Sequence, residues 1–236
     1  MRKTIFGDNI QYKLPRNCGE DFFHTYTKTK IYEGNLMLQM SEGSAFLDVG
    51  AHNGDVVLTL ALHARTHGRN DLRFFAFEPD INKTNFINQT AKENDLDINV
   101  YTCAVGDKSQ LVSRKTDYPV GAGAVAYNVG GDDSISMICL DSLKDVFGEV
   151  GFLHLDVEGW EAATLAGSNY ILSHNKPFIV AEVWNPISAA SRGFSTTPVD
   201  DIKEVLTGHG TRFKYHDTIS DGNTNLVFVP EGWQRN

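Results

Sequence analysis

The segment that most constrains this chain runs from Phe46 to Asp55 and reads FLDVGAHNGD. A short apolar run ends in a loop at Gly50, and a helical pattern begins at Gly54, which predicts a strand, a tight turn and a helix. Glycine lacks a Cβ atom and adopts positive φ, so the backbone can approach a ligand closely there, and the unpaired N–H groups of the new helix point to the same place. The segment is therefore predicted to bind the phosphate or nucleoside part of a cofactor.

The turn departs from the dinucleotide-binding fingerprint. The pattern G-x-G-x-x-G requires a second glycine two residues after the first, and this chain has His52 at that position. An NAD-linked oxidoreductase on a related sheet is therefore disfavoured, although it stays open as an alternative.

Composition bounds the class of protein. With 236 residues, 41% of them hydrophobic, the chain suits one α/β domain better than two. Its formal net charge of −9 argues against general binding to nucleic acid or to an anionic membrane, because both need a cationic surface. We expect a small-molecule or glycan partner. The sequence contains no apolar run of the length of a signal peptide or membrane span, so a cytoplasmic location is expected.

The chain has three cysteines, Cys18, Cys103 and Cys139, which are scattered along the sequence. They lack C-x-x-C spacing, so neither a disulfide framework nor a zinc site is predicted.

Apolar periodicity predicts alternating strands and helices. The expected strands cover residues 45–48, 72–78, 98–104, 151–156, 178–183, 213–215 and 226–229, and the expected helices include 56–62, 80–87, 162–165 and 199–206. Such βαβ alternation predicts a doubly wound, mostly parallel seven-stranded sheet, here with a terminal antiparallel hairpin. We place this α/β domain at residues 45–236.

Two segments break the alternation. Residues 1–44 are expected to form an N-terminal helical extension, with Ile31, Leu36, Met37 and Met40 on one helical face. This helix is expected to pack on the edge of the sheet, and a lid over the substrate is the alternative. Residues 109–138 are rich in turns and are predicted to form a mobile, β-rich insertion that reaches toward a ligand.

An acidic residue follows the second predicted strand. Glu78 lies at its carboxyl end, just before Pro79, and nucleotide-binding folds hold the ribose hydroxyls with an acid at such a position. The alternative is an acid at the N-terminus of the next helix, near Asp80.

A series of five motifs carries a family resemblance. The motifs are Asp48–Gly54 (DVGAHNG), Phe77–Pro79 (FEP), Ala104–Asp107 (AVGD), Leu140–Leu143 (LDSL) and Leu155–Glu161 (LDVEGWE). Between Phe46 and Glu182, this series resembles the S-adenosylmethionine-dependent methyltransferases of the FkbM type. The resemblance implies the class I methyltransferase fold, which is Rossmann-like, with S-adenosyl-L-methionine as cofactor and S-adenosyl-L-homocysteine as product. It also implies O-methylation of a sugar, glycan or natural-product hydroxyl.

The chain departs from the family pattern at two positions. His52 stands where the family commonly has asparagine, which changes the side chain beside the methionine part of the cofactor but not the glycine turn. His154 stands where lysine is usual, so any role of that lysine in the substrate site is in doubt.

Cofactor-binding roles follow from the motifs and the resemblance. The loop residues Gly50, Ala51, His52, Asn53 and Gly54 are assigned to the methionine side, Glu78 and Pro79 to the ribose, and Ala104 and Val105 to the adenine edge. Asp48 is expected to order the glycine loop by accepting backbone N–H bonds.

Catalytic candidates follow from the chemistry. Methyl transfer from a sulfonium is an in-line displacement, and a hydroxyl acceptor also needs a positioned base. We favour Asp156, acting on the acceptor or on the cofactor amine, with Glu158, His154 and Glu182 as companions. Glu158 has an alternative role as a loop-ordering carboxylate ahead of the helix at Glu161. Alternation along the strand favours a core or surface position for His154.

Two further alternatives concern the same region. Asp156, Glu158 and Glu182 offer the oxygen ligands that Mg²⁺ takes, but spacing does not show that they converge, and no metal is expected. Trp160 and Trp184 either wall the acceptor pocket or pack in the core. A cofactor-binding module without catalysis is the third alternative function, since function lies in the site and not in the fold.

Overall fold

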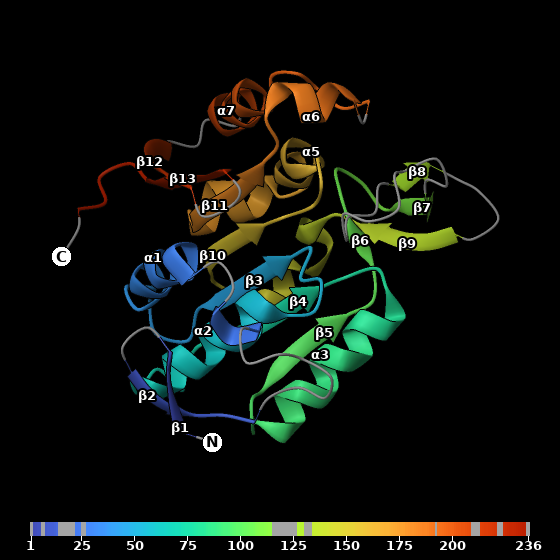
Figure 1. The fold of residues 1–236 in the computed structure, drawn as a ribbon. Coiled ribbons are helices and arrows are strands. Elements are labelled where there is room, and N and C mark those ends of the chain that lie inside the picture. The colour runs from blue at the N-terminus through green and yellow to red at the C-terminus, as the bar shows by residue number, and fades with distance from the viewer. Residues whose placement is uncertain are drawn as a thin grey trace.

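The computed structural model describes residues 2–5, 8–13, 22–24, 27–114, 127–129, 134–191, 193–208, 213–220 and 224–234. Its main sheet has seven strands in the order β12-β13-β11-β10-β3-β4-β5 (Figure 1). These strands are β3 (Ala45–Val49), β4 (Arg73–Phe77), β5 (Ile98–Tyr101), β10 (Val150–Leu155), β11 (Phe178–Val183), β12 (Phe213–Ser220) and β13 (Thr224–Pro230).

Strand β3 lies inside the parallel part of the sheet, between β10 and β4. The parallel pairing continues to β5 on one side and to β11 on the other. Strand β13 is antiparallel to both of its neighbours, β11 and β12. The predicted doubly wound, seven-stranded sheet with a terminal antiparallel hairpin is confirmed.

Helices cover both faces of this sheet (Figure 1). Helices α1 (Thr27–Met37), α2 (Asp55–Thr66) and α3 (Ile81–Glu93) share a buried cluster with one face, which includes Phe46 and Phe152. Helices α4 (Lys144–Phe147), α5 (Glu161–Ala166) and α7 (Pro198–Gly208) pack on the other face, which includes Leu47 and Leu153. Alternate residues of each strand therefore enter opposite cores, and both strand faces are apolar, as is typical of a parallel sheet.

A smaller sheet differs from the prediction. The single strand expected over 98–104 ends at Tyr101, and β6 (Ala104–Val105) pairs instead with β9 (Ser134–Ile138). The order of this second sheet is β6-β9-β7-β8, with β7 at Gln110–Arg114 and β8 at Tyr127–Val129. The chain turns away after Tyr101 because Ala104 packs with Val112 and Met137 of this sheet. Residues 115–126 and 130–133 of the expected insertion lie outside the described residues.

The N-terminal segment contains more than a helix. Strands β1 (Arg2–Ile5) and β2 (Asp8–Gln11) form an antiparallel pair that the sequence patterns did not predict, and a 3-10 turn, η1, covers Phe22–His24. Helix α1 packs against α2 and β12. The face predicted for it is wrong at one position, because Ile31 is 39% exposed.

The remaining elements connect the main ones. They are the 3-10 turn η2 (Leu140–Leu143), the π-helical turn η3 (Ile171–Asn175) and helix α6 (Pro186–Ser191). In the part of the chain that the structure describes, no helix has both the length and the apolar character needed to cross a membrane. Cys103 and Cys139 are free thiols, and Cys18 lies outside the described residues.

Candidate functional site

The glycine loop after β3 contains three residues with positive φ: Gly50 at 87°, His52 at 48° and Gly54 at 76°. The N–H groups of Gly50 and Ala51 both donate to the carbonyl oxygen of Phe77, at 2.9 and 3.0 Å, which holds the loop against the end of β4. Among residues other than glycine, asparagine, aspartate and histidine most readily adopt this left-handed conformation. His52 in place of the usual asparagine therefore preserves the backbone of the loop.

Gly50 also touches the loop after β10. A Cβ atom at this position would lie 1.9 Å from the carbonyl oxygen of Asp156. The same loop is joined to β3 by a hydrogen bond from the Asp156 N–H to the Val49 carbonyl, at 2.9 Å. The two loops are packed backbone to backbone, and only glycine fits at Gly50.

Asp48 is a buried carboxylate beneath the loop, with 1% of its surface exposed. Its Oδ2 accepts a hydrogen bond of 3.1 Å from the N–H of Val57, in the first turn of α2. The side chain thus orders the start of the helix rather than the glycine loop itself. Burial raises the pKa of Asp48 to about 7, against the opposing influence of His154.

Glu78 follows β4 and is 5% exposed. Its Oε2 accepts from the N–H of His52 at 2.9 Å, and its Oε1 accepts from the N–H of Asp80 at 3.0 Å. Burial raises the pKa of Glu78, and Lys83, whose Nζ lies 4.0 Å from Oε1, opposes this shift. The N-cap of α3 is Asp80, which accepts from the N–H of Asn82. Glu78 therefore links the loops that follow β3 and β4.

Four acidic side chains gather at the carboxyl ends of β10 and β11: Asp156, Glu158, Glu161 and Glu182. Burial, followed by repulsion from Glu182 and Glu158, raises the pKa of Asp156 well above its ordinary value. Burial also raises the pKa of Glu161 to about 7, and its Oε1 accepts from the N–H of Gly159 at 3.1 Å. Glu161 thus helps to order this loop, and the loop-ordering role considered for Glu158 stays a prediction. The acidic groups at this end of the sheet therefore lie close enough to repel one another when ionised.

His154 lies in the core, on the sheet face that strand alternation indicates. Its Nδ1 is 2.5 Å from Oε1 of Glu33, and its Nε2 is 4.0 Å from Oδ1 of Asp48. Burial alone would lower the pKa of His154, but Glu33, Asp48 and Asp156 together raise it to about 10. These acids favour the protonated form of His154, and Glu33 is a member of the cluster that sequence patterns did not indicate.

The residues expected at the adenine edge occupy the second sheet. Ala104 and Val105 are both buried in β6, and the carbonyl of Val105 faces the hydroxyl of Thr164 at 3.4 Å. Trp160 packs against the same cluster as Ala104, and no hydrogen-bond partner is described for its indole N–H.

The second tryptophan considered for the acceptor pocket, Trp184, directly follows β11. Trp184 packs edge-on against Phe194, with ring centroids 5.4 Å apart. These two rings and Glu161 line a cavity of about 30 Å³, which is large enough for a water molecule but not for a sugar. Asn53 and Pro79, assigned to the cofactor, are half-buried.

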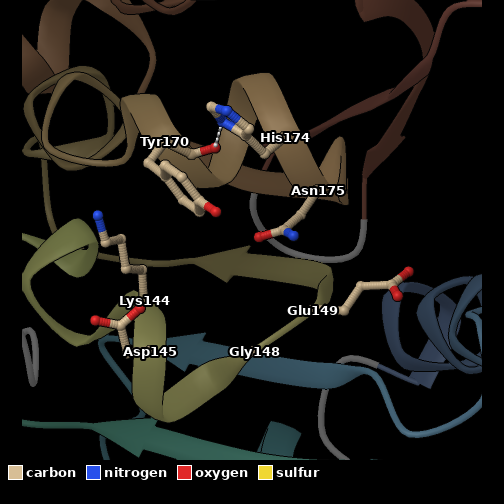
Figure 2. A pocket seen from close by; sticks show the side chains of 7 residues that line it. All are labelled: Lys144, Asp145, Gly148, Glu149, Tyr170, His174 and Asn175. Atoms are coloured by element: carbon tan, nitrogen blue, oxygen red, sulfur yellow. Dashed lines mark hydrogen bonds between the residues drawn. The ribbon is translucent and has the colours of Figure 1, made fainter.

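A larger cavity, of about 520 Å³, lies near the start of β10, at the opposite end from Asp156. Figure 2 shows its lining side chains, with Lys144 beside the ring of Tyr170 and His174 above that ring. The ammonium group of Lys144 is 4.6 Å from the centroid of Tyr170, whose ring also stacks on His174 at 4.1 Å. None of the residues predicted from sequence to bind cofactor or acceptor lines this cavity.

The carboxylates of this region carry the oxygen atoms that Mg²⁺ prefers as ligands. Over the described ranges, no group of three or more histidine, cysteine or acidic side chains is arranged to hold a metal ion.

A family model describes most of this chain: the methyltransferase FkbM domain matches residues 48–213. The chain belongs to the FkbM methyltransferase family. The match begins at Asp48 and includes the glycine loop, Glu78 and the acidic group around Asp156. The resemblance predicted from the five motifs is confirmed.

Solved structures share the fold. The crystal structure of methyltransferase FkbM from Methylobacillus flagellatus KT aligns with a TM-score of 0.54 and 18% identity, over 92% of this chain and 48% of that chain. Fibrillarin from Aeropyrum pernix, solved with natively bound S-adenosyl-L-methionine, aligns with a TM-score of 0.52 and 11% identity, over 89% of this chain and 76% of that chain. The chain thus spans about half the length of the FkbM structure. No curated protein matches it significantly in sequence.

Family membership implies S-adenosylmethionine as the cofactor. The donor set fits this molecule, whose sulfonium and ammonium groups are cations. Asp156 and Glu182 place acidic groups at the carboxyl ends of β10 and β11, and a cation bound there would favour their ionised forms. Glu78 offers a carboxylate with one backbone N–H on each oxygen, so further lone pairs are available to hydroxyl groups.

These raised pKa values predict how stability depends on pH. The ordinary pKa values of Asp48 and Glu161 are 3.8 and 4.5, and both rise to about 7 on folding. At pH values between its ordinary pKa and about 7, each of these carboxyl groups keeps a proton in the folded state that it has released in the unfolded state. The resulting stabilisation is complete at low pH and is lost as the pH rises through about 7, by at most about 1.4 kcal/mol per pH unit for each group.

Urea unfolding of the ligand-free protein at about pH 5, 6 and 7 measures this slope. We expect the free energy of unfolding to fall across the series and Glu161→Gln to flatten the decline. A free energy of unfolding that rises over the same interval would contradict the assignment of Asp48 and Glu161 as buried acids.

Proposed function

We infer that this chain transfers a methyl group from S-adenosylmethionine to a hydroxyl group of a sugar, glycan or natural product. The observation that carries the proposal is the acidic group at the carboxyl ends of the parallel strands, within a chain of the FkbM family. In open α/β sheets this end of the strands is where ligands bind.

We propose the cofactor contacts from the places of these residues at the carboxyl ends of the strands. The loop from Gly50 to Gly54 borders the methionine part, with Asp48 fixing the helix behind it. Glu78 accepts hydrogen bonds from the ribose hydroxyls, and Ala104 and Val105 border the adenine ring. The acidic character of Asp156 suits the cofactor amine.

The bound cofactor supplies an electrophilic methyl group on sulfur. The chain's own residues align the acceptor with that methyl group and exclude water. Asp156 is proposed to take the proton from the acceptor hydroxyl, because its raised pKa makes it a stronger base than an ordinary aspartate. Glu182 and Glu158 raise that basicity through their negative charge.

Isothermal titration calorimetry with S-adenosylhomocysteine tests the proposal. We expect saturable binding in roughly the micromolar range, and no stabilisation by NAD in a thermal unfolding assay. Absence of S-adenosylhomocysteine binding by folded protein would refute the proposal, and thermal protection by NAD alone would favour a Rossmann oxidoreductase. Binding without transfer to any hydroxyl acceptor would favour a cofactor-binding module.

Replacing Glu78 with alanine is expected to weaken S-adenosylhomocysteine binding by roughly 10- to 100-fold. The change leaves two ribose hydroxyls and the N–H of His52 without their acceptor, at a cost of about 1–3 kcal/mol. Calorimetry of Glu78→Ala measures the loss. The matched control is Glu93→Ala at the end of α3, where the carboxylate accepts a hydrogen bond from the side chain of Gln89. Equal affinity in the two variants would remove Glu78 from the ribose site.

A further inference from the structure

Helix α1 buries two charged side chains. Lys30 and Glu33 are both 0% exposed, although charged residues are almost never fully buried unless they are paired. Nζ of Lys30 lies 2.8 Å from Oδ2 of Asp55, in ion-pair contact but without hydrogen-bond alignment. Oε1 of Glu33 lies 2.5 Å from Nδ1 of His154. Two ion pairs therefore attach this helix to the α/β domain, one fully buried and one with a partly exposed Asp55.

Both partners adjoin the candidate cofactor site. Asp55 is the first residue of α2, directly after the glycine loop, and its charge acts on Asp48. His154 lies opposite Asp48 in the pairing of β10 with β3, and two residues before Asp156. A row of charges thus runs from Glu33 through His154 to Asp48.

The charges that face His154 come from three elements. They are Glu33 on α1, Asp48 on β3 and Asp156 after β10. Buried carboxylates that lack a neighbouring cation bind protons, and Asp48 and Asp156 both have raised pKa values even with His154 beside them. The hydrogen bond at 2.5 Å makes Glu33 the closest of the three acids to the imidazole.

We propose that Glu33 is a positioning residue of the cofactor site, because its carboxylate holds His154 as an imidazolium between the acids of β3 and β10. That cation favours the ionised form of Asp48, the acceptor for the first turn of α2, and the ionised form of Asp156, which suits a positively charged cofactor. The inference rests on the proposed function, and it gives α1 a part in cofactor binding.

Glu33→Gln tests this role, because it removes the charge and keeps the shape of the side chain. The first measurement is an NMR titration of the imidazole carbons, with the His154 signal assigned by its loss in His154→Gln. We expect His154 to stay protonated beyond about pH 8.5 in the wild-type protein and its midpoint to fall by about one unit or more in Glu33→Gln.

The second measurement is the affinity for S-adenosylhomocysteine at about pH 8.5. Glu33→Gln is expected to weaken binding roughly tenfold, the change that one pKa unit of lost interaction corresponds to. The matched control is Glu42→Gln, an exposed acid beyond the end of α1, which should change neither the midpoint nor the affinity. A purely structural Glu33 would shift the unfolding temperature without moving the His154 midpoint.

An unchanged His154 midpoint in Glu33→Gln overturns the proposal, and so does a lowered midpoint with unchanged affinity. If Glu33→Gln does not fold, Glu33→Asp replaces it, because it keeps the charge but withdraws it from the imidazole. A smaller fall of the midpoint is then expected, and no fall overturns the proposal. If the folded wild-type protein binds no S-adenosylhomocysteine, the proposed function fails, while the NMR titration still decides whether Glu33 sets the charge of His154.

Discussion

Replacing Gly50 with alanine is expected to destabilise the protein by about 2–4 kcal/mol and to abolish cofactor binding. The added Cβ atom would lie 1.9 Å from the carbonyl oxygen of Asp156, at a residue with φ of +87°. Backbone, not a flexible side chain, stands in its way, so β3 and β10 must separate at the ends where the ligand is proposed to bind. Urea unfolding and calorimetry with S-adenosylhomocysteine measure the two effects.

The matched control for this change is Gly43→Ala. Gly43 has a similar φ of +74°, but an added Cβ atom would meet nothing within 4 Å. This variant should be destabilised by about 1 kcal/mol, because alanine must adopt the left-handed conformation. It should bind S-adenosylhomocysteine normally. If Gly50→Ala proves no less stable than Gly43→Ala, the close packing of the two loops is wrong.

Replacing Asp156 with asparagine is expected to reduce methyl transfer by roughly 10²- to 10⁴-fold, the range for loss of a general base. The amide is close in size to the carboxylate but cannot accept the acceptor's proton. The fold should be retained, because the change relieves repulsion from Glu182 and Glu158. Initial rates of label transfer from methyl-labelled S-adenosylmethionine, on the best hydroxyl acceptor of a sugar panel, measure the loss.

Two observations complete the Asp156 experiment. If the dissociation constant for S-adenosylhomocysteine is unchanged in Asp156→Asn, Asp156 acts on the acceptor. If the dissociation constant rises, Asp156 binds the cofactor amine. The control is Asp145→Asn, an exposed acid in the cavity of Figure 2, remote from the acidic group. If Asp156→Asn turns over as fast as this control, Asp156 has no part in catalysis.

Local patterns predicted much of the main sheet. The continuous apolar runs before Gly50 and before Pro79 marked β3 and β4, and the apolar helix after Gly54 is buried from Val57 to Ala64. These features depend on residues close in sequence, such as the glycines that permit the turn and the proline that ends the strand. The family motifs then located Glu78 and Asp156 at strand ends.

Other features depend on partners far away in the chain. A helix-face pattern predicted Ile31 inside, but the buried face of α1 carries Glu33, whose partner His154 is 121 positions away. No local signal distinguishes a buried, paired glutamate from an exposed one. Likewise, Ala104 and Val105 read as a continuation of β5, and only their pairing with β9 places them in the second sheet.

The most direct test of the account is a crystal structure of the protein with S-adenosylhomocysteine bound. We predict that the ligand lies across the carboxyl ends of β3 and β4, with its ribose hydroxyls within hydrogen-bond distance of Glu78 and its thioether facing Asp156. Ligand bound instead in the cavity beside Lys144 and Tyr170, with the strand ends unaltered, would contradict the account.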